Sequence, residues 1–143
     1  MGIVDSYQFI RPERSKESRE YEILPDGYFD LAFLLSESTC RIFFAGPYTK
    51  KTNVPIGISE LIIVHFLVGR MPNFSNINPC ELVNTMIELP GINDLDGDTI
   101  GDLLLKRKTI GLRINLIEKI LDNVNVFLIS IDKIYENAIS MID

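Results

Sequence analysis

The chain has few residues that could do chemistry, and they gather around one carboxylate. Asp30 interrupts an otherwise apolar run over residues 28–35, which directly follows a Pro-Asp-Gly turn at residues 25–27. A buried carboxylate is costly unless it is paired or hydrogen-bonded. We weigh two roles for Asp30: it accepts backbone hydrogen bonds that fix the turn, or it lines the mouth of a pocket with Tyr28 and His65. The first role is favoured, because such a turn must be fixed in any fold that uses it.

Metal-dependent and nucleophilic catalysis need residues that this chain lacks. His65 is the single histidine, whereas metal sites draw on several histidines or carboxylates, and a Ser-His or Cys-His scheme needs a nucleophile motif that is absent. Residues 94–98 resemble the start of a calcium loop, but Leu105 stands where the bidentate glutamate belongs. Catalysis by a pair of carboxylates would have to use Asp26 and Asp30, and their spacing of four along a turn and a strand gives no reason to expect them to face each other. We expect no catalytic residue, no metal, no cofactor and no enzyme activity.

A binding module fits the residue types better. A small barrel or sheet can hold one ligand among apolar and aromatic side chains, with a few polar groups that orient it. The alternative is that the aromatic residues simply form core, and the two interpretations are equally balanced. The predicted ligand-binding residues are Tyr28, Asp30, Phe44, Tyr48 and His65.

Composition narrows the class of protein. With 143 residues and 46% hydrophobic content, the chain has the size of one domain with a substantial core. A net charge of -6 argues against direct binding to nucleic acid, which relies on clustered Lys and Arg. The sequence shows no secretory pattern and no run long enough to span a bilayer, so we expect a cytoplasmic protein without membrane contact. Cys40 and Cys80 belong to no CxxC pair and are expected to be reduced thiols.

The first half of the chain is predicted to be rich in strands. Residues 11–20 carry charge of both signs and no apolar member, so we expect a solvated loop there. The segments 46–47 and 52–55 contain Gly, Pro and Asn and predict an irregular excursion. Apolar alternation and β-branched content predict strands at residues 3–10, 21–24, 28–35, 41–45 and 58–68.

The second half is predicted to be helical. Asn78, followed by Pro79 and Glu81, is typical of a helix start and predicts a short helix to about Asn84. Further helices are predicted at 94–108 and after a cap at Thr109. An apolar stripe then predicts a terminal helix that either packs back or forms a homodimer through Phe127, Ile131, Ile134, Ala138 and Ile142.

These elements predict one α+β domain over residues 1–143. An antiparallel β-sheet or small barrel, at about residues 3–68, should be followed by helices at about 79–143. The chain would therefore be β-rich over 1–70 and helical over 71–143.

Several segments together form a familiar pattern. They are Leu-Pro-Asp-Gly-Tyr-Phe-Asp-Leu-Ala-Phe at 24–33, Phe-Phe-Ala-Gly-Pro-Tyr-Thr at 43–49, and the long apolar strand that ends near Gly69. With these segments the chain resembles the N-terminal domain of one group of AraC-type bacterial transcription regulators, over roughly residues 20–140. The final helices resemble the bridge that precedes the helix-turn-helix domain, through Leu116, Ile117, Glu118, Leu121, Ile134, Ala138 and Ile139.

Two departures from the group's pattern limit what the resemblance implies. Where the group tends to carry Arg-Phe-x-Pro-Gly, this chain has His-Phe-Leu-Val-Gly at 65–69, so a ligand contact through that arginine is not carried over. No helix-turn-helix domain follows Asp143, so we expect an excised N-terminal piece or a truncated relative. The resemblance implies a regulatory domain that senses a small-molecule effector, dimerises, or both, with DNA bound by a C-terminal domain absent from this chain. The alternative is a stand-alone small-molecule-binding barrel or a small enzyme.

Overall fold

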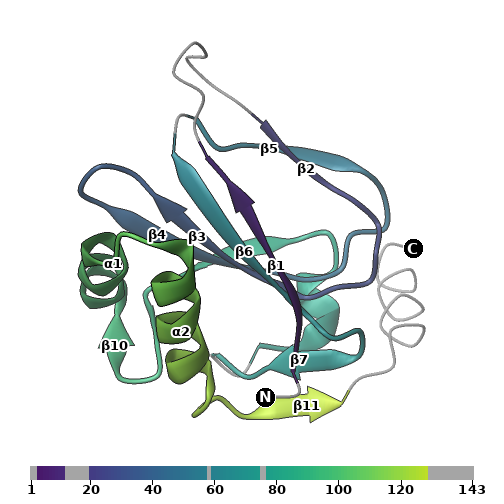
Figure 1. Cartoon of the computed structure of the whole chain (residues 1–143). Coiled ribbons are helices and arrows are strands. Elements are labelled where there is room, and N and C mark those ends of the chain that lie inside the picture. The colour runs from purple at the N-terminus through teal and green to yellow at the C-terminus, as the bar shows by residue number, and fades with distance from the viewer. Residues whose placement is uncertain (1–2, 12–19, 58, 75–76, 129–143) are drawn as a thin grey trace.

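A five-stranded antiparallel sheet forms the centre of the computed structural model, which describes residues 3–11, 20–57, 59–74 and 77–128 (Figure 1). The strands are rich in Ile, Val, Phe and Leu, the residues that pack well on a pleated surface. In spatial order they are β1 (Val4–Ile10), β6 (Glu60–Phe66), β3 (Asp30–Leu35), β4 (Cys40–Ala45) and β8 (Met86–Leu89). The α+β prediction is confirmed, and the strands among these residues form an open sheet rather than a closed barrel.

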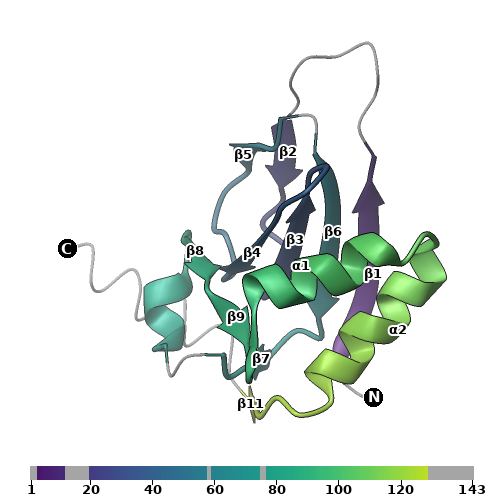
Figure 2. The ribbon, with the colours of Figure 1, turned by 90° about the vertical axis from the view of Figure 1, so that its left-hand side faces the viewer.

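The helices α1 (Gly97–Lys106) and α2 (Ile110–Leu121) cover one face of this sheet (Figure 2). Successive side chains of a strand point to opposite faces. Leu31 lies in register with Phe44 on β4 and with Val64 on β6, and all three are fully buried in the main core. The inner sides of the helices complete this core with Ile100, Leu104, Leu116, Ile117, Ile120 and Leu121.

Side-chain caps and one close contact explain where the helices begin and how α1 docks. Asp96 caps α1 by accepting from the backbone N–H of Thr99 at 2.7 Å. Thr109 caps α2 in the same way, which confirms the prediction of a cap at that residue. A Cβ atom added to Gly101 would lie 2.6 Å from the Cβ of Cys40, so a glycine here lets α1 approach β4.

A two-stranded ribbon, β2 (Glu20–Ile23) paired with β5 (Thr52–Pro55), lies over the opposite face of the sheet (Figure 1). Ile23 is buried there with Ala45 and Tyr48. Tyr21 and Ala32 both pack against a second cluster, which consists of Ile56, Leu61 and Ile63. The molecule therefore has three layers, with helices on one side of the sheet and the ribbon on the other.

The remaining elements of the described part of the chain are two short strand pairs and one helical turn. β7 (Arg70–Pro72) pairs with β11 (Val126–Leu128), and β9 (Gly91–Ile92) pairs with β10 (Leu95–Asp96). The predicted helix start at Asn78 is a single 3-10 turn, η1 (Pro79–Leu82), in which the Asn78 side chain accepts from the N–H of Cys80.

The predicted strands of the first half are confirmed, whereas six other strands of the described residues, β5 and β7 to β11, were not predicted. Thr52–Pro55 was predicted to be irregular but forms β5, because a proline fits an edge strand of a ribbon. The region after residue 70 is not purely helical, since β7 to β11 lie there. The prediction of a helix from Phe127 is wrong at its start, because Val126–Leu128 pairs with β7 as a strand.

Parts of two further predictions fall outside the described residues. Four members of the proposed dimer stripe lie there, namely Ile131, Ile134, Ala138 and Ile142, so dimerisation stays a prediction. Most of the charged segment predicted to be a loop, residues 12–19, lies there as well. Within the described part of the chain, neither helix is long and apolar enough to cross a membrane.

Candidate functional site

A buried Asp30–His65 pair lies on the face of the sheet that the ribbon covers. The two residues are direct neighbours in the register of β3 and β6, and each is only 8% exposed. Asp30 Oδ1 lies 2.7 Å from His65 Nδ1. Among the described residues, no other Asp, Glu, Lys, Arg or His is buried to this degree. The histidine thus supplies the partner that a buried carboxylate requires.

A hydrogen-bonded chain extends this pair to two more strands. His65 Nε2 lies 3.1 Å from Gln8 Oε1 on β1, and the same oxygen accepts from the hydroxyl of Tyr21 on β2 at 3.1 Å. The imidazole therefore has an oxygen at each nitrogen, and only a doubly protonated ring can donate to both. The geometry favours the imidazolium form of His65.

Hydrogen bonding and burial shift the pKa values of both members of the pair. The hydrogen bond to Asp30 raises the pKa of His65 and outweighs burial, which lowers it. Burial raises the pKa of the Asp30 carboxyl and outweighs the hydrogen bond from His65, which lowers it. The raised pKa of His65 agrees with the imidazolium form that the geometry favours, whereas the raised pKa of Asp30 reflects the cost of burying its charge.

Tyr28 and the turn before β3 lie beside this pair. The Tyr28 ring centroid is 5.3 Å from that of His65, and its hydroxyl donates to Asp5 at 3.1 Å. The favoured role of Asp30 as the anchor of the turn is wrong: Asp26 accepts from the backbone N–H of Tyr28 at 3.1 Å, while the Asp30 carboxylate bonds His65. Gly27 completes the turn at a φ of 80°, which glycine adopts without strain.

An apolar cavity of about 130 Å³ lies between the sheet and the ribbon, and Asp30 forms part of its wall. Its open side is marked by the half-buried side chains of Ala32, Leu34 and Phe43 and by the exposed Arg41. Apolar side chains dominate the lining, which consists of Tyr21, Ile23, Asp30, Ala32, Leu34, Arg41, Phe43, Ala45, Val54, Pro55, Ile56, Leu61, Ile63 and Met86. An apolar space with one polar group in its wall has the composition of a small-molecule site.

The predicted ligand-binding residues divide into three groups. Asp30 lines the cavity, and His65 and Tyr28 lie beside it. Tyr48 is buried with Ile23 and Ala45, and burial followed by the charge of Asp30 raises its pKa. Phe44 points to the opposite face, where it packs edge-on against Phe74 in the main core. Ligand binding by these residues stays a prediction.

Sequence reasoning missed Tyr21 and Gln8, which complete the polar chain. Burial, followed by the charges of Asp30 and Asp26, raises the pKa of Tyr21 to about 12. The signal that could have found Gln8 is the alternation of the strands. Gln8 pairs with Ile63 in the register of β1 and β6, and Ile63 is two residues from His65 and on the same face of the sheet. The partner of β2, however, could not be read from sequence.

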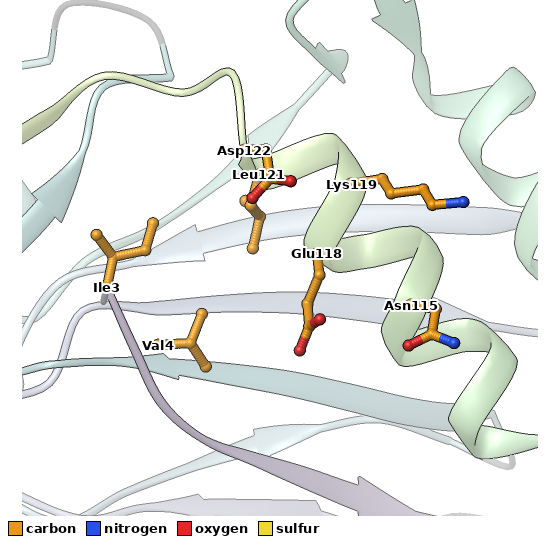
Figure 3. Close-up of a pocket in the computed structure, with 7 residues that line it drawn as sticks. All are labelled: Ile3, Val4, Asn115, Glu118, Lys119, Leu121 and Asp122. Carbon is orange, nitrogen blue, oxygen red and sulfur yellow. The ribbon is translucent and has the colours of Figure 1, made fainter. Parts of the chain in front are cut away.

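A second, wider depression of about 320 Å³ lies between the start of β1 and α2 (Figure 3). Glu118 extends from α2 toward the strand that carries Ile3 and Val4, while Lys119 points away. The hydroxyl of Tyr7 donates to Glu118 at 3.4 Å, and burial followed by Glu118 raises the Tyr7 pKa to about 12. The polar residues of this groove are exposed, and no buried polar group faces it. We therefore regard the cavity beside Asp30 as the better site.

No group of three or more His, Cys, Asp or Glu side chains in the described ranges is arranged to hold a metal ion. Burial raises the pKa of the Cys40 thiol to about 12, so this cysteine is a poor nucleophile or metal ligand at neutral pH.

Part of the chain matches a known family of protein domains. Residues 2–88 match the model of a family described as a domain of unknown function (DUF6597). No curated protein and no solved structure matches the chain. The matched range spans more than half of the 143 residues and includes every residue that lines the cavity beside Asp30.

Proposed function

The chain belongs to the DUF6597 family, and on this premise we propose that it is the effector-sensing domain of an AraC-type transcription regulator. In this proposal a small molecule binds between the sheet and the β2–β5 ribbon, and a C-terminal helix-turn-helix domain outside this chain binds DNA. The acidic charge of -6 is consistent with leaving DNA contacts to another domain.

The observation that carries the proposal is the apolar cavity with a buried carboxylate in its wall. Asp30 is 8% exposed, and a sheet that served only as scaffold would be more stable with an apolar residue at this place. A cavity with mostly apolar lining and one orienting polar group is the usual form of a ligand site. The resemblance of residues 24–33 and 43–49 to the regulators adds the biological role, because those segments form the turn, β3 and β4 that build the cavity wall.

Strand β1 offers a route from the cavity to the helices. Gln8 points to the cavity side and bonds His65, whereas its neighbour Tyr7 points to the helical side and bonds Glu118 on α2. A ligand that moves the hydrogen-bonded chain of Asp30, His65 and Gln8 shifts β1, and β1 in turn shifts α2. In the proposal the DNA-binding domain follows α2 along the chain and responds to this shift. A ligand can drive this change only by the difference between its affinities for the two arrangements.

A pair of substitutions tests ligand binding at the cavity. Ala32→Leu adds three carbons to the cavity wall, and Asn115→Leu places the same side chain in the groove of Figure 3. We expect compounds that raise the thermal midpoint of the wild type, measured by circular dichroism, to lose their effect in Ala32→Leu and to keep it in Asn115→Leu. The opposite pattern would place the site in the groove and contradict the proposal.

The regulator role is tested separately through the gene. We expect the genomic reading frame to continue past Asp143 into a basic helix-turn-helix segment. A stop codon directly after Asp143 would refute the regulator role and leave the alternative of a stand-alone small-molecule-binding module.

A further inference from the structure

The Asp30 carboxylate has one oxygen without a hydrogen-bond donor in the described part of the chain. Oδ1 is 2.7 Å from His65 Nδ1, and His65 is the sole hydrogen-bond partner of this carboxylate among those residues. Oδ2 is therefore an unused acceptor, although Asp30 is 8% exposed and forms part of the cavity wall. Buried acceptors without a donor are rare and costly, so this oxygen marks a place where a ligand can supply one.

The cavity limits the size of such a ligand. Its volume is about 130 Å³. A protein cavity of about 150 Å³ that is lined by apolar side chains holds one benzene molecule. A ligand that fits here without moving the ribbon is therefore a single ring or an aliphatic group of similar size. The half-buried Ala32, Leu34 and Phe43 leave room for a small substituent on the open side.

The charges around the cavity favour a neutral ligand. His65 already balances Asp30, because the ring faces oxygens on both sides and the pair has no net charge. The nearby cations are also paired: Arg41 bonds Glu88 at 2.7 Å, and Lys51 lies 3.7 Å from Glu22. An ammonium ion would bring an uncompensated positive charge to a balanced pair, and a carboxylate would meet Asp30 itself.

We propose, building on the proposed function, that the cavity binds a neutral small molecule consisting of a benzene-sized apolar body and one hydroxyl that donates a hydrogen bond to Asp30 Oδ2. Phenol is the simplest probe of this class. Its ring fills the space between Ala32, Ile63 and Met86, and its hydroxyl supplies the missing donor. An ordinary carboxylate–hydroxyl hydrogen bond then distinguishes the ligand from a hydrocarbon of the same size.

Four probes of nearly equal size separate the parts of this proposal. Phenol, toluene, benzylammonium and benzoate are titrated into the 15N-labelled chain at pH 6.5, and amide shifts are followed by NMR. We expect phenol to bind at least tenfold more tightly than toluene, with the largest shifts at Ala32 and Ile63, and the two ions to bind more weakly than toluene. Ala32→Leu should abolish phenol binding, and Asn115→Leu should preserve it.

A further variant, Asp30→Ala, removes the proposed hydrogen-bond acceptor. In Asp30→Ala the preference for phenol over toluene should fall to less than twofold, while toluene still binds. The ligand series on the wild type remains decisive if this variant does not fold.

The outcomes separate this inference from the function on which it rests. Equal affinities for phenol and toluene, or a higher affinity for benzylammonium or benzoate than for phenol, overturn the inference. If Ala32→Leu then no longer binds these probes, the cavity remains a ligand site and the proposed function stands. Absence of binding by all four probes, each at the highest concentration at which it dissolves, also overturns the inference. The proposed function is judged separately by the compound screen and the reading frame.

Discussion

Replacing His65 with leucine tests whether the buried Asp30 carboxylate depends on His65 as its counterion. Asp30 and His65 are each 8% exposed and 2.7 Å apart, so the substitution leaves a buried carboxylate without its counterion. Loss of one partner of a buried pair costs about 3–5 kcal/mol. We take the lower end, about 3 kcal/mol, because a buried carboxyl can take up a proton when its partner is lost. For a chain of this size, the thermal midpoint should fall by about 6–12 °C, at about 2–4 °C per kcal/mol.

The double variant Asp30→Leu/His65→Leu supplies the control. Replacing a buried ion pair with apolar residues of similar volume is often neutral or stabilising, so we expect its free energy of unfolding within about 1 kcal/mol of the wild type. Urea denaturation followed by circular dichroism measures four proteins: the wild type, His65→Leu, Asp30→Leu and the double variant. If His65→Leu unfolds at the wild-type midpoint, or if the double variant loses the sum of two single losses, the two residues are not coupled and the reasoning fails.

Three further predictions concern protonation and packing. The pKa of His65 is raised above 6.5 in the folded state, so its contribution to stability is complete below pH 6.5 and is lost as the pH rises through the folded-state pKa. The free energy of unfolding of the wild type should therefore decline over this pH range. If the free energy of unfolding of Asp30→Asn declines with the same slope, the pair is not the source of the pH dependence. Gly101→Ala should lower the urea midpoint, because its new Cβ would lie 2.6 Å from the Cβ of Cys40. Gly111→Ala has nothing within 4 Å of its new Cβ, so its free energy of unfolding should rise by about 0.5–1 kcal/mol. Equal effects of the two substitutions on stability would contradict the close packing of α1. Thr109→Ala should cost about 1 kcal/mol and Thr109→Ser much less, measured by thermal denaturation, because the side-chain oxygen caps α2; similar losses in both would exclude the cap.

The long strands and the helix caps could be predicted because their signals are local. β3 and β6 are apolar over most of their length, and Thr109 stands directly before an amphipathic segment. By contrast, β5 contains Asn53 and Pro55 and has its strand conformation through pairing with β2, some thirty residues earlier in sequence. Pairing over such a distance leaves no mark in the local pattern, so this strand and the ribbon could not be foreseen.

The two residues of the buried pair could be predicted from the sequence, but their geometry could not. An aspartate in an apolar strand requires a partner, and the single histidine lay in the other long apolar strand, so Asp30 and His65 could be named together. Their contact depends on the register of β3 against β6, which places the two residues directly opposite each other. Phe44 has the same residue type as a ligand-lining aromatic, but the alternation of β4 places it on the helical face.

The most direct test of the central claim is the position of a bound probe. A crystal of the chain soaked with 4-bromophenol shows the bromine by its anomalous scattering. We predict the bromine between the sheet and the β2–β5 ribbon, near Ala32 and Leu34, with the hydroxyl within hydrogen-bond distance of Asp30 Oδ2. Bromine found only in the groove between β1 and α2, or no bromine in the cavity at saturating probe, would contradict the account.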